Sequence, residues 1–245
     1  MRKTIAVIFA LFALIGSNAA SGATGPVVTR TANKPNQPRI LQLPAAHNGV
    51  RVPRADGADA GLVKIFNNFT QYKNSPYWGW SGYAVLGPDA GGEAGAEQWL
   101  AAPFTPAADH TATKVELAGL HYSGGNTFFV SINSDASGLP GKALHTFHLK
   151  NLPSVVCCGV DGAVDTTGVK LQGGKQYWIV FGTNANDTNA GAIWGFSEFA
   201  SVQEHGANMA IYCVGTGCGQ LGYKDNAWNP EQNLLYGLAF AVLGT

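Results

Sequence analysis

Aromatic residues are concentrated in the segment Tyr77 to Tyr83, where four of the seven residues carry rings and glycines lie between them. If this segment is extended, Trp78 and Trp80 share one face, because successive side chains of a strand point to opposite faces. Two indoles on one face form a surface on which sugar rings stack. The favoured alternative is that one face fills the core, since aromatic side chains dominate protein cores. Trp78, Trp80 and Tyr83 are the candidate ligand-binding residues of this segment.

A second candidate platform for a ligand is Trp228, which lies in the polar segment Asp225 to Pro230. Asp, Asn and Pro are turn-forming residues, so this segment is predicted to be a loop. Low net charge fits a neutral ligand better than a phosphate or a nucleic acid. The aromatic residues therefore indicate polysaccharide as the ligand class.

Carboxylates that could act in catalysis are placed by the sequence in loops or at strand ends: Asp135, Asp161, Asp165, Asp187, Glu198, Glu204 and Asp225. Glycoside hydrolysis needs two carboxylates that flank a cleft, and the sequence does not say which two converge. The Asn133-Ser134-Asp135 segment offers oxygens, but its spacing matches no dedicated calcium loop. The chain contains neither a G-x-S-x-G nor an H-E-x-x-H motif. No catalytic residue is assigned, and we expect neither a metal nor a cofactor.

The four cysteines form two groups. Cys157 and Cys158 are adjacent, and Cys213 and Cys218 bracket Val-Gly-Thr-Gly. Four thiolates can bind zinc, but these spacings differ from the usual C-x2-C and no His lies within a few positions. Disulfides are the favoured interpretation because they are typical of exported proteins, and three pairings are open.

The N-terminus has the three parts of a secretory signal peptide. Arg2 and Lys3 precede an apolar run from Ile5 to Ile15, and small residues follow. The apolar run is shorter than the ~20 residues that span a bilayer. We therefore predict a signal peptide over residues 1–23, cleaved after Ala19 or Ala23, and a secreted, extracellular protein.

The mature chain has a nearly balanced charge. Without Arg2 and Lys3, 13 of the 15 basic residues remain against 15 acidic ones, a net charge of −2 with His neutral. No cluster of Lys and Arg is present, which argues against a nucleic-acid partner. No basic amphipathic stretch favours a membrane surface, and no membrane span is expected in the mature chain. The oligomeric state stays open.

The remaining chain is predicted to hold an arm and one compact domain. Residues 24–60 are rich in Pro, Asn, Gln, Ala and Gly and read as a flexible arm or linker, with Ile40 to Leu43 as one candidate strand. Residues 61–245 are predicted to form an all-β domain, because short alternating or apolar runs are separated by Gly-rich turns. Val115 and Leu117 are predicted to point inward, and Lys114 and Glu116 outward.

A strand–loop–strand unit is predicted from Phe128 to Leu149. In its first half, Phe128, Val130 and Ile132 alternate with Phe129 and Ser131 as in a strand with one face inward, and the loop Asn133 to Gly141 is rich in turn-forming residues. Leu144 and Phe147, predicted to point inward, are three residues apart, which predicts a β-bulge in the returning strand. The apolar run Gln176 to Phe181 predicts a central strand with both faces buried.

Three segments of the chain resemble the bacterial extracellular choice-of-anchor R type domains: WLAAPFTPAADHTATKVELA (Trp99 to Ala118), VSINSDASGLPGKAL (Val130 to Leu144) and VDTTGVKLQGGKQYWIVF (Val164 to Phe181). The resemblance covers residues 97–197 and implies an antiparallel β-sandwich of jelly-roll type with a cell-surface or extracellular location. It carries over no catalytic residue. The C-terminus shows no hydrophobic span followed by a basic tail, so we expect free secretion.

The sequence leaves three functions open. The first is a secreted, non-catalytic β-sandwich module that binds polysaccharide or other cell-surface material. The second is a secreted jelly-roll glycoside hydrolase or lyase, and the third is a structural component of an extracellular matrix. Exposed aromatic rings support the first, whereas two facing carboxylates in a cleft support the second.

Overall fold

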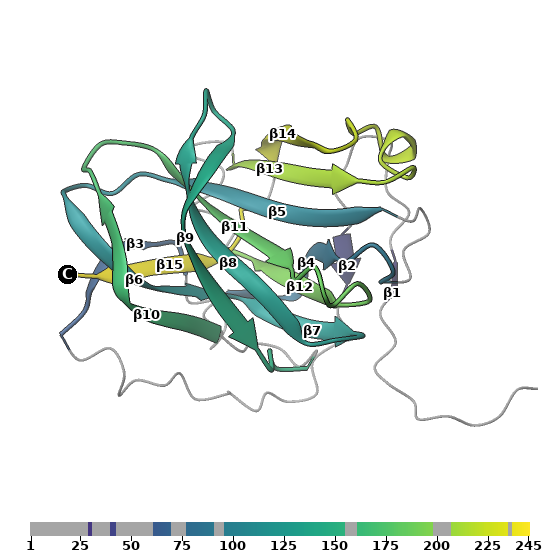
Figure 1. The fold of residues 1–245 in the computed structure, drawn as a ribbon, viewed down its shortest axis with the longest axis horizontal. Coiled ribbons are helices and arrows are strands. Elements are labelled where there is room, and N and C mark those ends of the chain that lie inside the picture. Colours follow the sequence, from purple (N-terminus) through teal and green to yellow (C-terminus); the bar gives the residue numbers. More distant parts are fainter. Residues whose placement is uncertain are drawn as a thin grey trace, which may run out of the picture.

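The computed structural model describes residues 29–30, 40–42, 61–69, 77–90, 96–154, 161–197, 207–234 and 237–245. In these residues nearly all of the regular secondary structure is antiparallel strand, arranged in a larger and a smaller curled sheet (Figure 1). The one helical element among them is the short 3-10 helix η1 (Gly219–Leu221). The described part of the chain contains no helix of the length and apolar character needed to cross a membrane. The predicted all-β, antiparallel sandwich is confirmed, and the jelly-roll connectivity stays a prediction.

The smaller sheet contains four strands in the order β10 (Asp161–Leu171), β6 (His110–Leu117), β15 (Phe240–Gly244) and β3 (Val63–Asn67). All of its pairings are antiparallel. On β6, Val115 and Leu117 are buried in the core, as their alternation predicts. This sheet therefore supplies one wall of the sandwich.

The opposite face of β6 corrects the expectation that its charged residues are exposed. Lys114 and Glu116 do lie on that face, but only 5% and 2% of their surfaces are accessible. Lys114 Nζ lies 2.8 Å from Glu116 Oε1. A charge removed from water is tolerated when it is paired, which accounts for the burial of both residues together.

Six adjacent strands of the larger sheet carry the residues of the candidate ligand-binding groove. Their order is β14 (Ala227–Leu234), β13 (Ala207–Val214), β5 (Glu97–Phe104), β11 (Tyr177–Thr183), β8 (Thr127–Asp135) and β9 (Pro140–Lys150). Figure 1 shows β13 and β14 beside β5, with the β8–β9 hairpin on the other side of β11. β11 is the predicted central strand, and all seven of its residues are buried.

The other part of the larger sheet is built around β4 (Trp78–Leu86). β4 pairs with β12 (Gly191–Phe196), which pairs with β7 (Gly119–Ser123). It also pairs with β2 (Ile40–Gln42), which pairs with β1 (Thr29–Arg30). Two short strands of the segment predicted to be an arm are thus attached to the sheet.

Large aromatic side chains fill the space between the sheets. Phe240 on β15 is 1% exposed and lies edge-on to Trp194 of β12 and to Phe104 of β5. The Trp194 indole N–H donates to the carbonyl of Ala239 at 2.9 Å. Buried indoles generally satisfy their N–H in this way. The two sheets are therefore joined by packing and by a directional bond.

The β8–β9 hairpin confirms the predicted strand–loop–strand unit. Ile132 pairs with His145 and Asn133 pairs with Ala143, so the register shifts at Leu144. The predicted bulge is present, but Leu144 is the extra residue, and 42% of its surface is exposed. The prediction that Leu144 points inward is therefore wrong, because an extra residue in a bulge leaves the alternation of its strand.

Candidate ligand-binding groove

The residues proposed from the segment Tyr77 to Tyr83 have different positions. Tyr83 on β4 is 2% exposed, and its ring packs edge-on against Phe196 at a centroid distance of 4.7 Å. Its ring is part of the core, because β4 directs that face between the sheets, so Tyr83 does not form a surface platform. The backbones of Trp78 and Trp80 lie in β4, and their side chains lie outside the described part of the structure. Their role in binding stays a prediction.

Trp228 is part of a row of aromatic rings that crosses the larger sheet. It lies on β14 directly opposite Tyr212 of β13, with ring centroids 5.3 Å apart. Tyr212 lies directly opposite Trp99 of β5, and these two rings stack at 4.9 Å with an interplanar angle of 29°. Trp99 in turn meets Phe129 of β8 edge-on at 5.0 Å. We call Trp228, Tyr212, Trp99 and Phe129 the aromatic row; all four are partly exposed.

A glycine allows the last two rings of the aromatic row to meet. β11 runs between β5 and β8, and its Gly182 is paired with Phe129. A Cβ on Gly182 would lie 2.6 Å from Phe129 Cζ and 2.8 Å from Trp99 Cγ. These distances are below van der Waals contact, so any other residue at position 182 would push the two rings apart. The absence of a side chain is thus a local requirement for a continuous row.

A shallow, open groove of about 460 Å³ runs beside the aromatic row. It is lined by nine described residues: Trp99, Phe129, Ser131, Asn133, Ala143, Thr146, Val180, Tyr212 and Trp228. None of these nine carries a formal charge. Six adjacent strands contribute to the lining, so the groove extends over the full width of this part of the sheet.

Hydrogen bonds fix the orientation of the central indole. Trp99 Nε1–H donates to Glu97 Oε1 at 2.9 Å and lies 3.3 Å from Thr183 Oγ1. Thr183 Oγ1–H also donates to Glu97 Oε1, at 3.2 Å. Because its N–H is bound within the protein, Trp99 presents mainly the apolar part of its ring to the groove. A preorganised ring loses little conformational entropy when it binds a ligand.

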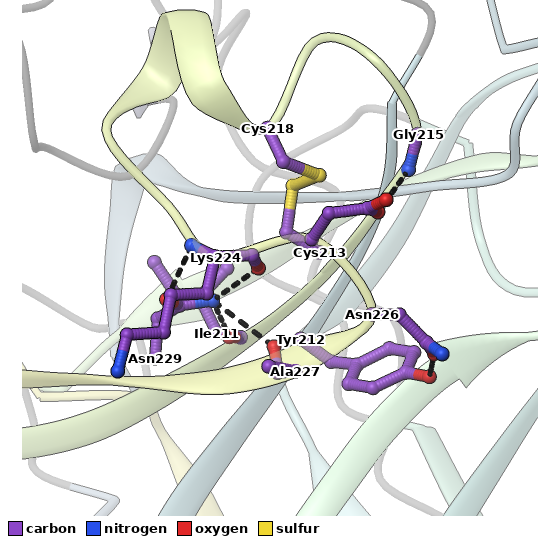
Figure 2. Close-up of a disulfide and its surroundings, with 10 residues drawn as sticks. Ile211, Tyr212, Cys213, Gly215, Cys218, Lys224, Asn226, Ala227 and Asn229 are labelled. Atoms are coloured by element: carbon purple, nitrogen blue, oxygen red, sulfur yellow. Dashed lines mark hydrogen bonds between the residues drawn. A yellow bond between two sulfur atoms is a disulfide. The ribbon is translucent and has the colours of Figure 1, made fainter.

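The loop between β13 and β14 holds Tyr212, the second ring of the aromatic row counted from Trp228 (Figure 2). Cys213 at the end of β13 forms a disulfide with Cys218, and Asp225 accepts the backbone N–H of Gly215 at 2.8 Å. The Tyr212 hydroxyl donates to Asn226 Oδ1 in the same loop. The loop therefore fixes the hydroxyl end of the Tyr212 ring, which lines the groove.

Asn229 on β14 stabilises the base of this loop. It is 7% exposed, and its side-chain oxygen accepts the N–H of Lys224 at 2.8 Å (Figure 2). Its amide group donates to the carbonyls of Lys224 and Ala227 at 3.1 and 3.0 Å. Since Asn229 follows Trp228 directly, this network fixes the strand position that carries the indole. The polar segment predicted to be a loop is thus partly a strand.

Polar groups of the groove are contributed by the β8–β9 hairpin. Ser131 Oγ–H donates to Asn133 Oδ1 at 2.7 Å, and Asn133 Nδ2–H donates to the carbonyl of Gly141 at 2.8 Å. Both residues are buried, at 3% and 7% exposure. Thr146, opposite Ser131 on β9, is exposed. Its hydroxyl group can donate and accept a hydrogen bond.

The carboxylates proposed from the sequence have separate positions, and the described ones bind backbone or side chains of the protein. Asp187 accepts the N–H of Thr127 at 3.0 Å, Asp165 accepts the N–H of Thr167 at 2.8 Å, and Asp225 accepts that of Gly215. The side chain of Asp161 and all of Glu198 and Glu204 lie outside the described residues. Such bonds are typical of structural carboxylates at turns.

Asp135 at the end of β8 is also bound within the protein. It accepts hydrogen bonds from Trp178 Nε1 and Gln176 Nε2, both at 2.8 Å, and from the Gly138 N–H. Partial burial acts to raise the pKa of this carboxyl, but the three hydrogen bonds outweigh it and hold the pKa below its usual value. Asp135 is therefore an ionised structural acceptor.

The two carboxylates at either end of the groove strands are too far apart to act as a hydrolytic pair. β5 and β8 run in the same direction, because both are antiparallel to β11 between them, and Trp99 and Phe129 lie at the same level of the sheet. Glu97 lies two residues before Trp99 and Asp135 lies six residues after Phe129, so eight residues of strand separate the two carboxylates. Eight residues of strand correspond to roughly 26 Å, whereas glycosidase carboxylates are ~5–9.5 Å apart. Glu97 and Asp135 do not form the facing pair that the hydrolase interpretation requires.

Glu231 is an acidic residue that the sequence did not single out. It lies on β14 opposite the buried Met209, so it is on the core side of the strand. Burial raises the pKa of the Glu231 carboxyl, and a hydrogen bond with Tyr223 acts in the opposite direction. This residue faces away from the groove, because Trp228 and Glu231 lie on opposite faces of β14.

The cysteine prediction is confirmed for one pair. Cys213 and Cys218 form a disulfide, with Cα atoms 5.8 Å apart. Cys157 and Cys158 lie outside the described residues. Within the described part of the chain, no three His, Cys, Asp or Glu side chains are grouped as metal ligands would be.

The chain matches no family model, no curated protein and no solved structure. Its resemblance to the choice-of-anchor R type domains therefore stays a prediction. The sequence pattern singles out Trp228 but not Trp99, Tyr212 or Phe129. Each of these three lies in an apolar run, where no signal distinguishes an exposed ring from a core ring.

Proposed function

We propose that this protein is a secreted, non-catalytic β-sandwich module that binds a neutral polysaccharide in the groove beside the aromatic row. The observation that carries the proposal is the continuous contact of four partly exposed rings, at centroid distances of 5.3, 4.9 and 5.0 Å, along a groove without formal charges. Sugar rings have apolar C–H faces and hydroxyl edges. Aromatic rings pack against the apolar C–H faces, and the hydroxyl of Thr146 can form hydrogen bonds with the sugar hydroxyl groups.

The uncharged lining favours a neutral ligand. A phosphorylated or sulfated ligand would lose its water in the groove without gaining a cation, which is costly for a charged group. Aromatic contacts contribute ~0.5–1.5 kcal/mol each beyond the buried area. Several such contacts in one groove give an affinity suited to reversible attachment to a polymer. A protein of this kind acts at the surface of a cell or in the extracellular matrix, in line with the signal peptide predicted over residues 1–23.

A glycan array with the purified mature protein, followed by calorimetry on the glycans that bind, tests the proposal. Tyr212→Ala should weaken binding about tenfold, because it removes the ring that joins Trp228 to Trp99. Tyr212→Phe keeps the ring and loses the bond to Asn226, so it should bind within about threefold of the wild type. Tyr122→Ala, in a partly buried aromatic of β7 outside the groove, is the matched control and should bind like the wild type.

Two further results distinguish the alternatives. If Trp80→Ala abolishes binding while Tyr212→Ala has no effect, the ligand binds at β4 and the groove is not the site. If purified protein cleaves the glycans, the hydrolase or lyase interpretation holds and the non-catalytic proposal is wrong. Absence of binding to any neutral glycan at millimolar concentration would also overturn it.

A further inference from the structure

The direction of the groove follows from the strand register. Tyr212 is directly opposite both Trp228 and Trp99, and Phe129 is directly opposite Gly182 on one side and His148 on the other. The aromatic row is therefore perpendicular to the strands. It extends over five strands, which corresponds to about 19 Å at the backbone for a strand spacing of ~4.8 Å.

A second row of residues runs parallel to the aromatic row, two positions further along each strand. Its members are paired in register across all six strands: Pro230, Ala210, Ala101, Val180, Ser131 and Thr146. Four of the six are apolar and lie on β14, β13, β5 and β11. The two hydroxyl residues lie on β8 and β9. The second row thus changes from apolar to hydroxyl-bearing across the sheet.

These two rows give the groove chemically different ends. At the β14 end, the second-row residues Pro230 and Ala210 have no hydrogen-bonding side chains, so the second row adds only apolar contact to the stacking on Trp228. At the β9 end, Thr146 is exposed, and the buried pair Ser131 and Asn133 lies behind it. Within the second row, side-chain hydroxyl groups are present at this end only.

We infer that the groove takes a linear chain of neutral sugars whose long axis crosses the strands from Trp228 to Thr146, and that affinity therefore rises with chain length. This inference rests on the proposed function. One sugar ring in an extended chain advances by a distance close to one ring-to-ring step of the aromatic row. The three ring-to-ring steps of the aromatic row, each about 5 Å, therefore match a segment of three to four sugars.

The two ends should respond differently to substitution. A short oligosaccharide binds at the β9 end, where hydrogen bonds add to stacking, and leaves Trp228 uncovered. A longer one reaches Trp228. Trp228→Ala should thus weaken binding of long chains only, whereas Thr146→Val, which removes the hydroxyl group and keeps the shape, should weaken binding of all chains.

Isothermal titration calorimetry with cello-, xylo- and manno-oligosaccharides from the disaccharide to the hexasaccharide tests this inference. For the series that binds, affinity should rise up to the tetrasaccharide and then level off. Trp228→Ala should weaken the tetrasaccharide about tenfold and the disaccharide less than twofold. Thr146→Val should weaken both about fivefold. Trp228→Phe, which keeps a ring, and a thermal melt of each variant control for local disruption.

The outcomes separate the inference from the function on which it rests. Affinity that does not depend on chain length, or an equal effect of Trp228→Ala on short and long chains, overturns the inference and leaves a neutral-glycan site in place. Failure of every series to bind, together with a negative glycan array, overturns the proposed function itself.

Discussion

Gly182→Ala tests the geometry of the aromatic row without removing any ring. The new methyl group would lie 2.6 Å from Phe129 Cζ, 2.7 Å from Phe129 Cε1 and 2.8 Å from Trp99 Cγ. Phe129 is partly exposed and its contacting atoms are at the free end of the ring, so Phe129 is expected to swing away. Trp99 is held by Glu97 and Thr183 and has less freedom to move.

The expected magnitude follows from two opposing contributions. Overpacking typically costs ~1–3 kcal/mol. Replacing a glycine by alanine offsets ~0.4–1 kcal/mol of this, because the unfolded chain loses conformational freedom. The free energy of unfolding should therefore fall by about 1–2 kcal/mol, which lowers Tm by roughly 2–8 °C for a chain of this size. Ligand affinity should fall about tenfold, because the contact between Phe129 and Trp99 is lost.

Thermal unfolding and calorimetry with a binding oligosaccharide measure the two effects. Gly219→Ala is the matched control: a Cβ there meets no atom within 4 Å, so its affinity should equal that of the wild type, and its Tm should be equal or slightly higher because the unfolded chain loses conformational freedom. If Gly182→Ala melts and binds like the wild type, the rings do not depend on the missing side chain, and the account of the continuous row is refuted. A loss of Tm with unchanged affinity would refute the role of Phe129 in binding.

Three other perturbations test the rest of the molecule. Lys114→Met removes the cation 2.8 Å from the buried Glu116 and should lower the free energy of unfolding, measured by chemical denaturation, by ~3–5 kcal/mol. The double variant Lys114→Met/Glu116→Leu should recover most of this loss, and additive losses from the two substitutions would contradict the pairing. Replacing Cys213 and Cys218 by Ala opens a ring with a sequence separation of 5 and should cost about 2 kcal/mol, and non-reducing peptide mapping that finds either thiol alkylatable would disprove the bridge. The pKa of Asp135 is lowered in the folded state, so its contribution to stability is complete above the unfolded-state pKa of ~3.9 and is lost as pH falls through the folded-state pKa. Asp135→Asn should therefore make the loss of stability with falling pH less steep below about pH 4, and an unchanged acid-unfolding profile would refute this.

Local features of the fold were predictable because they depend on near neighbours in the chain. The apolar run Gln176 to Phe181 has no polar face, and the structure places it between β5 and β8 with its strand residues buried. The slip in alternation between Leu144 and Phe147 predicts a bulge, and the register of β8 and β9 contains one. Disulfides are the favoured interpretation of the cysteines with the pairing left open, and the structure shows that Cys213 is bonded to Cys218.

The sequence by itself thus determined the strand class and the hairpin, because these depend on alternation and turn residues, and it favoured disulfides without deciding how the cysteines pair. It did not determine which strands are adjacent. Trp99, Phe129, Tyr212 and Trp228 are far apart in the chain, and only the order β14, β13, β5, β11, β8 brings them into contact. Alternation shows that two residues share the face of one strand, but not which face is covered, so tertiary pairing decided the groove.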